Sequence, residues 1–336
     1  MNLLNFIELF PDEDSCKQKY KEVRDSVGVT CAECKSKDHY WKKDKWQYEC
    51  KQCGKRTTLR SGTAMHGSRL PFRHWFIAMH LLTSTKKSFS ALELQRQLGH
   101  NRYEPVWSML HKLREVMGRR DGEYELSGVI ELDDGFFSTI KPEGEKGKQL
   151  KRGRGSQKKS KVLVMVESVP VEGETTRKGK QRKVGHIKMV VIEDLKANTI
   201  TPMVEESLSK HTIINSDNST SYVKLKDLEM EHIPEIIPKE KVNEMLPWVH
   251  IAISNAKRLL LDIHHDVEPQ YLQSYLNEFC YKYNRRYFGD ELFERLLIAA
   301  VSYKNEFQVS KRIVIKINIK HGQSVIILNL VWNYMF

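Results

Sequence analysis

Hydrophobic positions between residues 71 and 120 recur with the 3.6-residue period of α-helices. Pro71 suits a first helical position, and one apolar face follows it: Phe72, Trp75, Phe76, Met79 and Leu82. A second helix is predicted to begin at the capping box of Ser90 and Glu93 and to end at Gly99, and a third to begin near Tyr103. The last two helices have the outline of a helix-turn-helix, an outline that any small helical bundle shares.

From Val129 onward the pattern changes to runs of β-branched residues. Such runs predict three strands close enough along the chain to form an antiparallel meander, at 129–133, 161–169 and 185–192. A fourth strand is predicted at 211–215, and long helices follow at 247–261, 269–287 and 290–303. This order predicts an α/β domain of the ribonuclease H-like type, in which helices flank a mixed sheet. Residues 309–336 read as two further apolar β-like runs, to which the sequence assigns no function.

The composition of the 336 residues is that of a folded protein of about two domains, 40% hydrophobic and 29% charged. A transmembrane helix and a secretory signal are not expected, since long apolar runs and a basic N-terminal region are missing. Lys and Arg number 55 against 43 Asp and Glu, a net charge of +12. Such a surplus favours a polyanionic partner, nucleic acid first and an acidic membrane surface second.

The positive charge is concentrated between residues 141 and 183, which hold 14 Lys and Arg against 5 acids. Two Gly- and Lys-rich stretches flank an apolar run there, which indicates two solvated loops around one strand. Contact of these loops with phosphate groups is compatible with that interpretation.

Two cysteine pairs have the spacing of a metal site. Cys31 and Cys34 form one C-x-x-C pair, Cys50 and Cys53 form the other, and 15 residues separate the pairs. Each pair can offer two thiolates to a tetrahedral Zn²⁺, and the interval suits a β-hairpin. Redox cysteines or chance are the alternatives, but two matched pairs are more specific than one. A closed four-cysteine site is structural, so we expect the zinc to organise a ribbon and to catalyse nothing.

Two acids follow predicted strands. Asp133 follows the run 129–132 and Asp217 follows the strand 211–215, so we expect both at strand ends. Carboxylates brought together from adjacent strands suit a site for two Mg²⁺ ions that cleaves phosphodiesters. Either acid alone is more often a cap or a turn. Asn255 lies in a predicted helix and could offer a carbonyl oxygen to Mg²⁺, although its position alone favours a surface residue.

From about residue 5 to residue 305 the chain resembles the zinc-ribbon insertion-sequence transposases of the DDE superfamily. The residues that carry the resemblance stand in this order: Cys31-x-x-Cys34 and Cys50-x-x-Cys53, Arg60-Ser-Gly62-Thr63-Ala-Met-His66, Trp75-Phe76, Glu131-Leu-Asp133-Asp134, Ser216-Asp217 with Tyr222, Trp248-Val-His250, Ser254-Asn255-x-Lys257-Arg258, His265, and Tyr275-Leu-Asn-Glu278-Phe279 before Asn284-Arg285-Arg286.

The resemblance implies that Asp133 and Asp217 are catalytic carboxylates that bind Mg²⁺ or Mn²⁺. The third ligand, Glu in most members, aligns with Asn255, and Asp134 and Asp262 are candidate substitutes for the missing charge. The side chains that the resemblance nominates for DNA phosphate are His250, Lys257, Arg258 and His265. The tail departs from the family's pattern, and a late frameshift or a read-through would explain it.

The implied protein is a DNA transposase that binds the terminal inverted repeats of its element and catalyses cleavage and strand transfer. It is expected in the cytoplasm, associated with the nucleoid, as a homodimer or higher assembly on double-stranded DNA. The alternatives are an inactive DNA-binding relic or recruited regulator, and a ribonuclease H-like nuclease of other purpose. The expected organisation is a helical lead-in (1–28), a zinc ribbon (29–66), a helical DNA-binding module (67–122), the catalytic domain (126–307) and the atypical tail (308–336).

Overall fold

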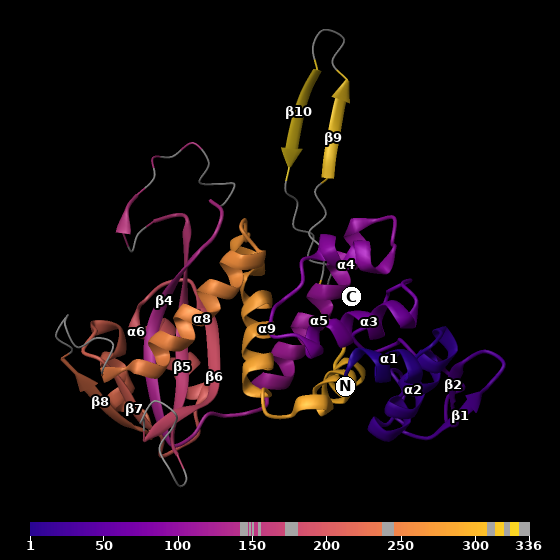
Figure 1. The fold of residues 1–336 in the computed structure, drawn as a ribbon, viewed down its shortest axis with the longest axis horizontal. Helices are drawn as coiled ribbons and strands as arrows, with labels where there is room; N and C mark the ends of the chain where they lie inside the picture. Colours follow the sequence, from indigo (N-terminus) through magenta and orange to yellow (C-terminus); the bar gives the residue numbers. More distant parts are fainter. Residues whose placement is uncertain are drawn as a thin grey trace. The chain divides into compact units, whose positions relative to one another are not determined.

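The computed structural model describes residues 1–141, 147, 149, 151–153, 156–171, 181–236 and 245–307, and the backbone of 313–318 and 323–328. The chain forms two compact units, Met1–Asn305 and Glu306–Phe336. In the second unit, β9 (Ile313–Asn318) and β10 (Gln323–Leu328) pair antiparallel (Figure 1). The origin of this tail stays a prediction. No helix in the described part of the chain is long and apolar enough to cross a membrane.

The first unit begins with two helices and a small sheet. The helices are α1 (Leu3–Leu9) and α2 (Glu13–Val27), and the antiparallel sheet contains β1 (His39–Lys42), β2 (Gln47–Cys50) and β3 (Arg56–Thr58). Three helices follow: α3 (Phe72–Ser84), α4 (Ala91–Leu98) and α5 (Tyr103–Gly122). Ser90 caps α4 by accepting a hydrogen bond from the Glu93 N–H at 3.0 Å, and Gly99 ends it in the left-handed region at φ 60°. These predicted boundaries are confirmed.

The small sheet is held against α2 by aromatic and charged side chains. Lys17 lies 4.0 Å above the Trp46 ring and Lys21 lies 4.6 Å above the Trp41 ring. The Tyr48 hydroxyl donates to Asp25 at 2.6 Å. These contacts pack the sheet β1–β3 directly against α2.

The helices share one hydrophobic core, and the last helix of the unit joins it. Apolar residues of α3 and α5 form its centre, among them Trp75, Phe76 and Leu110. Phe293, Leu296 and Ala300 of α10 (Leu292–Ser302) belong to the same core, although they stand about 170 residues further along the chain than α5. The predicted domain boundaries stay a prediction, and this packing joins α10 to the N-terminal helices.

A five-stranded mixed sheet forms the second half of the unit, in the order β6-β5-β4-β7-β8 (Figure 1). The strands are β4 (Val129–Ser138), β5 (Lys159–Pro170), β6 (Arg182–Ile192), β7 (Ile213–Asp217) and β8 (Glu231–Glu235). The predicted meander of β4, β5 and β6 is confirmed as antiparallel, and β7 and β8 add parallel to β4. A mixed sheet of this kind with helices on its faces fits a ribonuclease H-like domain.

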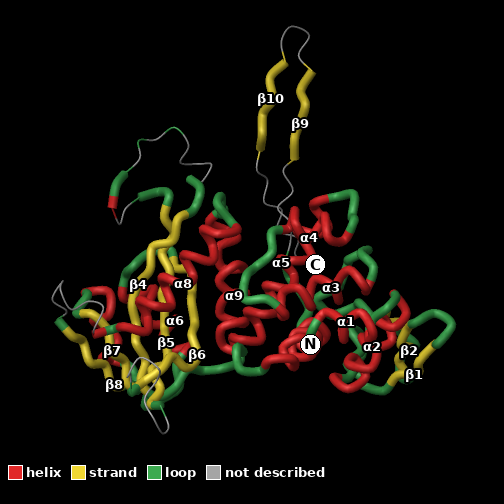
Figure 2. Tube along the Cα trace, in the orientation of Figure 1, coloured by secondary structure: helices red, strands yellow, loops and turns green. Residues whose placement is uncertain are grey.

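Helices cover both faces of the sheet (Figure 2). Along β5, Val162, Val164 and Val166 pack against α8 (Pro247–Ile263) and α9 (Leu272–Asn284). The alternate residues Leu163 and Met165 pack against α6 (Ala197–Ser207) and the 3₁₀ helix η3 (Thr220–Asp227). Short 3₁₀ turns precede the last two helices, η5 (Pro269–Tyr271) and η6 (Gly289–Glu291). Because β5 is buried on both sides, it reads as a continuous apolar run.

Helices α5 and α9 connect the N-terminal helices to the sheet. Arg114 of α5 donates through Nε to Glu278 of α9 at 2.8 Å, and the two side chains are 2% and 1% exposed. A Cβ atom on Gly118 would lie 2.2 Å from Nδ2 of Asn277, so a larger residue there would displace the Asn277 side chain. Helix α5 is consequently buried or half-buried along most of its length, and its exposed residues are Tyr103 and Glu104 at the start and Gly122 at the end. The helix-turn-helix outline stays a prediction, and the part of α5 open to a DNA groove lies mainly at the start of the helix.

Candidate active site and metal centre

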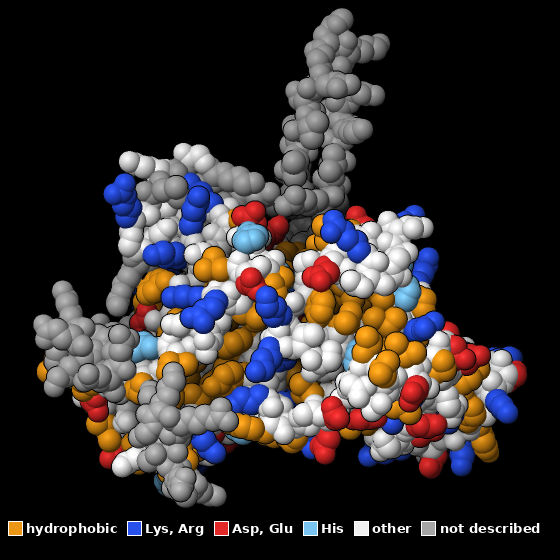
Figure 3. Space-filling view, viewed as in Figure 1, with side chains coloured by type: hydrophobic (Ala, Val, Ile, Leu, Met, Phe, Trp, Pro, Cys, Tyr) orange, Lys and Arg blue, Asp and Glu red, His pale blue; other side chains and the backbone are white. Residues whose placement is uncertain are grey.

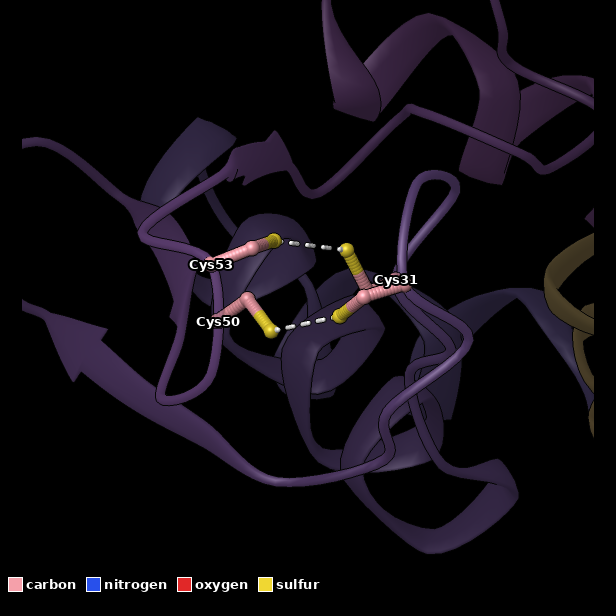
Figure 4. A group of neighbouring side chains, drawn as sticks. Cys31, Cys50 and Cys53 are labelled. Carbon is pink, nitrogen blue, oxygen red and sulfur yellow. Dashed lines mark hydrogen bonds between the residues drawn. The ribbon is translucent and has the colours of Figure 1, made fainter.

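The four motif cysteines lie together at one end of the ribbon (Figure 4). Sγ of Cys31 is 3.5 Å from Sγ of Cys53, and Sγ of Cys34 is 3.4 Å from Sγ of Cys50. All four sulfur atoms lie within 4.8 Å of one another. Four thiolates at about 2.3 Å from one Zn²⁺ require sulfur separations of roughly 3.8 Å, so this group fits a tetrahedral zinc ion.

The backbone around the cysteines favours thiolates. The Cys53 N–H lowers the pKa of Cys50 to about 6, and the Cys34 N–H lowers the pKa of Cys31. Zinc binds the deprotonated thiol. Backbone N–H groups also lower the pKa values of Cys34 and Cys53, but burial and the neighbouring thiols outweigh them and raise the pKa of Cys34 to about 12 and that of Cys53 above its ordinary value. Zinc binding at neutral pH must therefore displace protons from these two thiols.

Asp133 and Asp217 lie on neighbouring parallel strands. The register pairs Leu132 of β4 with Ser216 of β7, so the two acids occupy the next positions along each strand. Because paired residues of parallel strands project from the same face, both side chains share one face of the sheet. Asp217 ends β7 as predicted, but the prediction that Asp133 ends its strand is wrong, since β4 continues to Ser138. Residues 134–138 continue the pairing with β5, so the strand extends beyond Asp133.

The acid pair fits a divalent cation. Oδ1 of Asp217 is buried and has no hydrogen-bond partner among the described residues. A buried carboxylate oxygen without a partner is costly unless a cation or a proton neutralises it. Two adjacent carboxylates also repel each other because both carry negative charge, and a cation between them would relieve this repulsion. Their arrangement supplies the oxygen ligands that Mg²⁺ and Mn²⁺ accept.

Glu131 fixes the helix that faces these acids. This buried glutamate is 5% exposed and lies on β4 two residues before Asp133, on the same face. Its Oε2 accepts from the backbone N–H groups of Trp248 at 2.7 Å and Val249 at 3.0 Å. These are the first residues of α8, whose own N-cap, Leu246, offers no side-chain cap. A carboxylate at a helix N-terminus is favoured by the helix dipole, so Glu131 docks α8 on the strand of Asp133.

Glu131 has no predicted role in the site, although it belongs to the Glu131-Leu-Asp133-Asp134 motif. Two signals were present: an acid two positions before Asp133 in an alternating strand, and a helix that starts at Pro247 without a capping side chain. Neither signal indicates that Glu131 caps this helix, because 117 positions separate Glu131 from Trp248 in the sequence.

Helix α8 brings His250 and Lys257 to Asp133. Nδ1 of His250 is 3.5 Å from Oδ2 of Asp133. Burial and the charge of Lys159 lower the pKa of Lys257, and the attraction of Asp133 opposes them. Seven residues complete almost two helical turns, so His250 and Lys257 share one side of α8. Asn255 is half-buried and lies about 140° around the helix from His250, at 100° per residue.

The other candidates lie further from the pair. Asp134 alternates with Asp133 and projects from the opposite face of the sheet. Asp262 pairs with Lys87 at 3.2 Å, about 18 Å along α8 from His250 at 1.5 Å per residue. Arg258 is exposed on α8, and His265 is exposed beyond its end. The roles of Arg258 and His265 as phosphate ligands stay predictions.

The surface around α8 is rich in cations. Figure 3 shows Lys and Arg side chains over the region of α8 and α9. The basic stretches between residues 141 and 183 are mostly outside the described residues. Their proposed contact with phosphate remains a prediction.

Glu131→Gln is expected to lower the rate of any metal-dependent cleavage about tenfold or more, because small displacements of a positioned group reduce catalysis strongly. The glutamine keeps an acceptor oxygen but loses the charge that the helix dipole favours, at a cost of about 1–2 kcal/mol of stability. Single-turnover cleavage rates and denaturant melts of the same preparations measure both effects.

Glu167→Gln is the matched control for this prediction. Glu167 is also buried on the sheet, and it accepts from the backbone N–H groups of Ser127 at 3.1 Å and His186 at 2.8 Å. It touches no residue of α8 in these contacts. We expect its substitution to reduce stability comparably and to leave the cleavage rate within about threefold. Equal losses of rate in both variants would contradict a positioning role for Glu131.

Comparison with known proteins agrees with this geometry. Residues 125–284 match the sequence model of the ISXO2-like transposase domain. A protein of Halobacterium salinarum, described as an uncharacterized protein in transposable element ISH50, is 24% identical over 169 residues, which are 49% of this chain. The match covers 55% of that protein, so the chain spans about half the length of this curated relative.

Solved structures of Mos1 transposase are also similar over part of their length. The pre-cleavage Mos1 transpososome is 13% identical, with 72% of this chain and 82% of that chain covered, and the Mos1 paired-end complex with Mn is 14% identical, with 72% and 91% covered. Both have a TM-score of 0.27, too low to support a shared arrangement of the whole chain. The domain match and the acid pair on the sheet carry the assignment. Residues 125–284 match an ISXO2-like transposase domain, and this match together with the curated relative supports an insertion-sequence transposase family of the DDE type.

Proposed function

We propose that the protein binds the terminal inverted repeats of its element, cleaves the DNA at the element ends and transfers the freed strands to target DNA. The observation that carries the proposal is the pairing of Asp133 and Asp217 on one face of the sheet, with a carboxylate oxygen that lacks a partner among the described residues. The transposase domain match supports the same activity.

Some of the site residues would bind the metal ion or the DNA phosphate, and others position the elements that carry them. Asp133 and Asp217 would hold Mg²⁺ or Mn²⁺, which supplies an activated water and stabilises negative charge on the phosphate. Lys257 stands on the side of α8 that faces Asp133 and can hold a DNA phosphate there. Glu131 holds the start of α8 against strand β4 by accepting two of its backbone N–H groups. Phosphoryl transfer of this kind depends on positioning and charge, and no covalent enzyme intermediate is required.

We propose His250 for the third position of the site, where the sequence predicted Asn255. His250 lies beside Asp133, while Asn255 points to another side of the same helix. An imidazole nitrogen suits Mn²⁺ better than Mg²⁺, which prefers oxygen ligands. The site should therefore work better with Mn²⁺.

His250→Ala is expected to reduce the Mn²⁺-dependent cleavage rate about 10²-fold, because loss of a metal-site group typically costs 10–100-fold in affinity or activity. Asn255→Ala, on the same helix, should stay within about threefold. Cleavage rates at several Mn²⁺ and Mg²⁺ concentrations distinguish the two. A large loss in Asn255→Ala with none in His250→Ala would restore Asn255 as the third ligand.

The DNA partner would be double-stranded, with the element ends and the target bound in turn. The net charge of +12 and the cations around α8 favour such contact. Since two element ends must be cut together, we expect a homodimer or a higher assembly on DNA, within the cytoplasm.

An in vitro cleavage and strand-transfer assay tests the proposal. The substrate is linear duplex DNA carrying the repeats that flank the gene, and a duplex with scrambled ends is the control. We expect metal-dependent nicks at the repeat ends and joined products with target plasmid. Specific binding without cleavage in Mg²⁺ or Mn²⁺ would leave a DNA-binding protein, and cleavage without preference for the repeats would indicate a nuclease of another purpose.

A further inference from the structure

A cavity of 480 Å³ lies beside the first turns of α5. One wall is the chain from Gly67 to Pro71, which leads from the ribbon into α3, and the other is one face of α5. The α5 face contains residues spaced three or four apart: Pro105, Ser108, Met109 and Lys112. A volume of this size lies within the range of about 300–1,000 Å³ typical of small-molecule pockets and exceeds what a free phosphate needs.

The charged groups that line the cavity are all cations. Arg69, Arg102 and Lys112 contribute to the lining together with His100, and no Asp or Glu lines it. Arg69 and Arg102 are exposed, and neither forms an ion pair in the part of the chain that the structure describes. Arg102 is also the N-cap of α5, whose 20 residues add partial positive charge at this end. The cavity therefore favours an anionic ligand.

The remaining lining is apolar and includes an unused donor. Leu70 and Pro71 contribute apolar atoms, and Trp75 lies fully buried beneath them. The indole Nε1–H of Trp75 is buried and has no acceptor among the described residues. A cationic rim over an apolar wall matches a phosphate next to a sugar or a flat base, which are the parts of a nucleotide.

We propose that this cavity binds one nucleotide of the element end, with its phosphate at Arg69 and Arg102 and its sugar or base against the apolar wall. The inference rests on the proposed function and gives it a DNA contact outside the acid pair. Most of α5 is buried against α9 and the N-terminal core, so the exposed beginning of α5 is where this helix can meet DNA. Recognition then uses a pocket at the helix start, where a helix-turn-helix would lay a helix along the groove.

Two variants of the full-length protein test the charge and the shape separately. The double variant Arg69→Ala with Arg102→Ala removes two cations, and Ser108→Phe fills the cavity without a change of charge. Lys224→Ala with Lys226→Ala, on η3, is the matched loss of two exposed cations. Each is titrated with the terminal-repeat duplex and with the scrambled duplex over a series of salt concentrations.

We expect both pocket variants to bind the repeat duplex with an affinity at least about tenfold lower than that of the wild type. In the arginine variant, the slope of log affinity against log salt concentration should become about two less steep, because two phosphate contacts are lost. The η3 variant should bind like wild type. Normal binding by Ser108→Phe would overturn the insertion of a nucleotide, and equal losses in the η3 variant would overturn the pocket as a specific contact.

The same preparations separate this inference from the proposed function. At saturating DNA and Mn²⁺, the pocket variants should cleave at the wild-type rate, because the acid pair is intact. If the wild type binds repeats through the pocket but never cleaves, the pocket stands and the proposed function fails. If the wild type cleaves and the pocket variants bind the repeats normally, the nucleotide-binding role of the cavity is contradicted and the proposed function stands.

Discussion

Asp133→Asn is expected to lower the rate of metal-dependent cleavage at the element ends by about 10³-fold, a loss of roughly 4 kcal/mol of transition-state stabilisation. Asp133 lies beside Asp217 in the register of β4 and β7 and beside His250 across the sheet face. The asparagine has the same size but no charge, so the cation loses the ligand that the carboxylate pair provides. The fold should survive, because removing one of two adjacent carboxylates relieves their repulsion.

Asp134→Asn is the matched control, because it changes the same chemical group at the next position of the strand. Asp134 projects from the other face, where it can neither bind the cation nor approach the phosphate. Its cleavage rate should remain within about threefold of wild type. Measurements with excess Mn²⁺ and with melting curves show whether either variant has lost metal affinity or folding. A rate for Asp133→Asn near that of wild type would remove the acid pair from the mechanism.

Removal of zinc is expected to unfold the ribbon and to release its contacts with α2. Structural zinc contributes about 10–16 kcal/mol in apparent binding free energy at neutral pH, more than the whole stability of most domains. Without the ion, four thiols remain within 4.8 Å of one another beside a sheet of three short strands. Cys50→Ser should have the same effect as a chelator, since it removes a sulfur that lies 3.4 Å from that of Cys34.

The measurement combines zinc content with hydrogen exchange of residues 29–66. We expect one zinc ion per wild-type chain, loss of the ion in Cys50→Ser, and fast exchange of the ribbon amides in that variant. Fluorescence should change as well, because Trp41 and Trp46 leave the lysines of α2. Cys280→Ala, a buried cysteine of α9 outside the cluster, is the control and should keep its zinc. A protected ribbon without bound metal would contradict a structural zinc site.

Local signals in the sequence predicted much of the fold. The cap at Ser90, the stop at Gly99 and the apolar runs of β4, β5 and β6 depend on neighbouring residues, and the structure confirms them. Strand β8 was missed because its sequence, Glu-His-Ile-Pro-Glu, has neither an apolar run nor alternation. Its place in the sheet comes from pairing with β7, which no local pattern encodes.

In the candidate site, too, local signals indicated the acid pair but not the contacts that depend on packing. Asp133 and Asp217 could be recognised from motifs and from strand positions, and their register places them together. The role of Glu131 and the direction of Asn255 depend on how α8 lies across the sheet. Spacing along a helix indicates which residues share a side, but only the packed structure shows which side faces the acids.

The packing of α10 has a consequence for how the chain folds during synthesis. Residues from the end of the first unit complete the hydrophobic core that α3 and α5 begin, and the Ala64 N–H donates to the Ala300 carbonyl at 2.8 Å. While the ribosome is still making the sheet, the N-terminal helices lack this last helix and expose the apolar surface that it covers. The cavity beside α5 is built on that same core. A chain that stops before residue 292 therefore has the acid pair but an unfinished N-terminal half, and the core around α3 and α5 is complete only after α10 has left the ribosome.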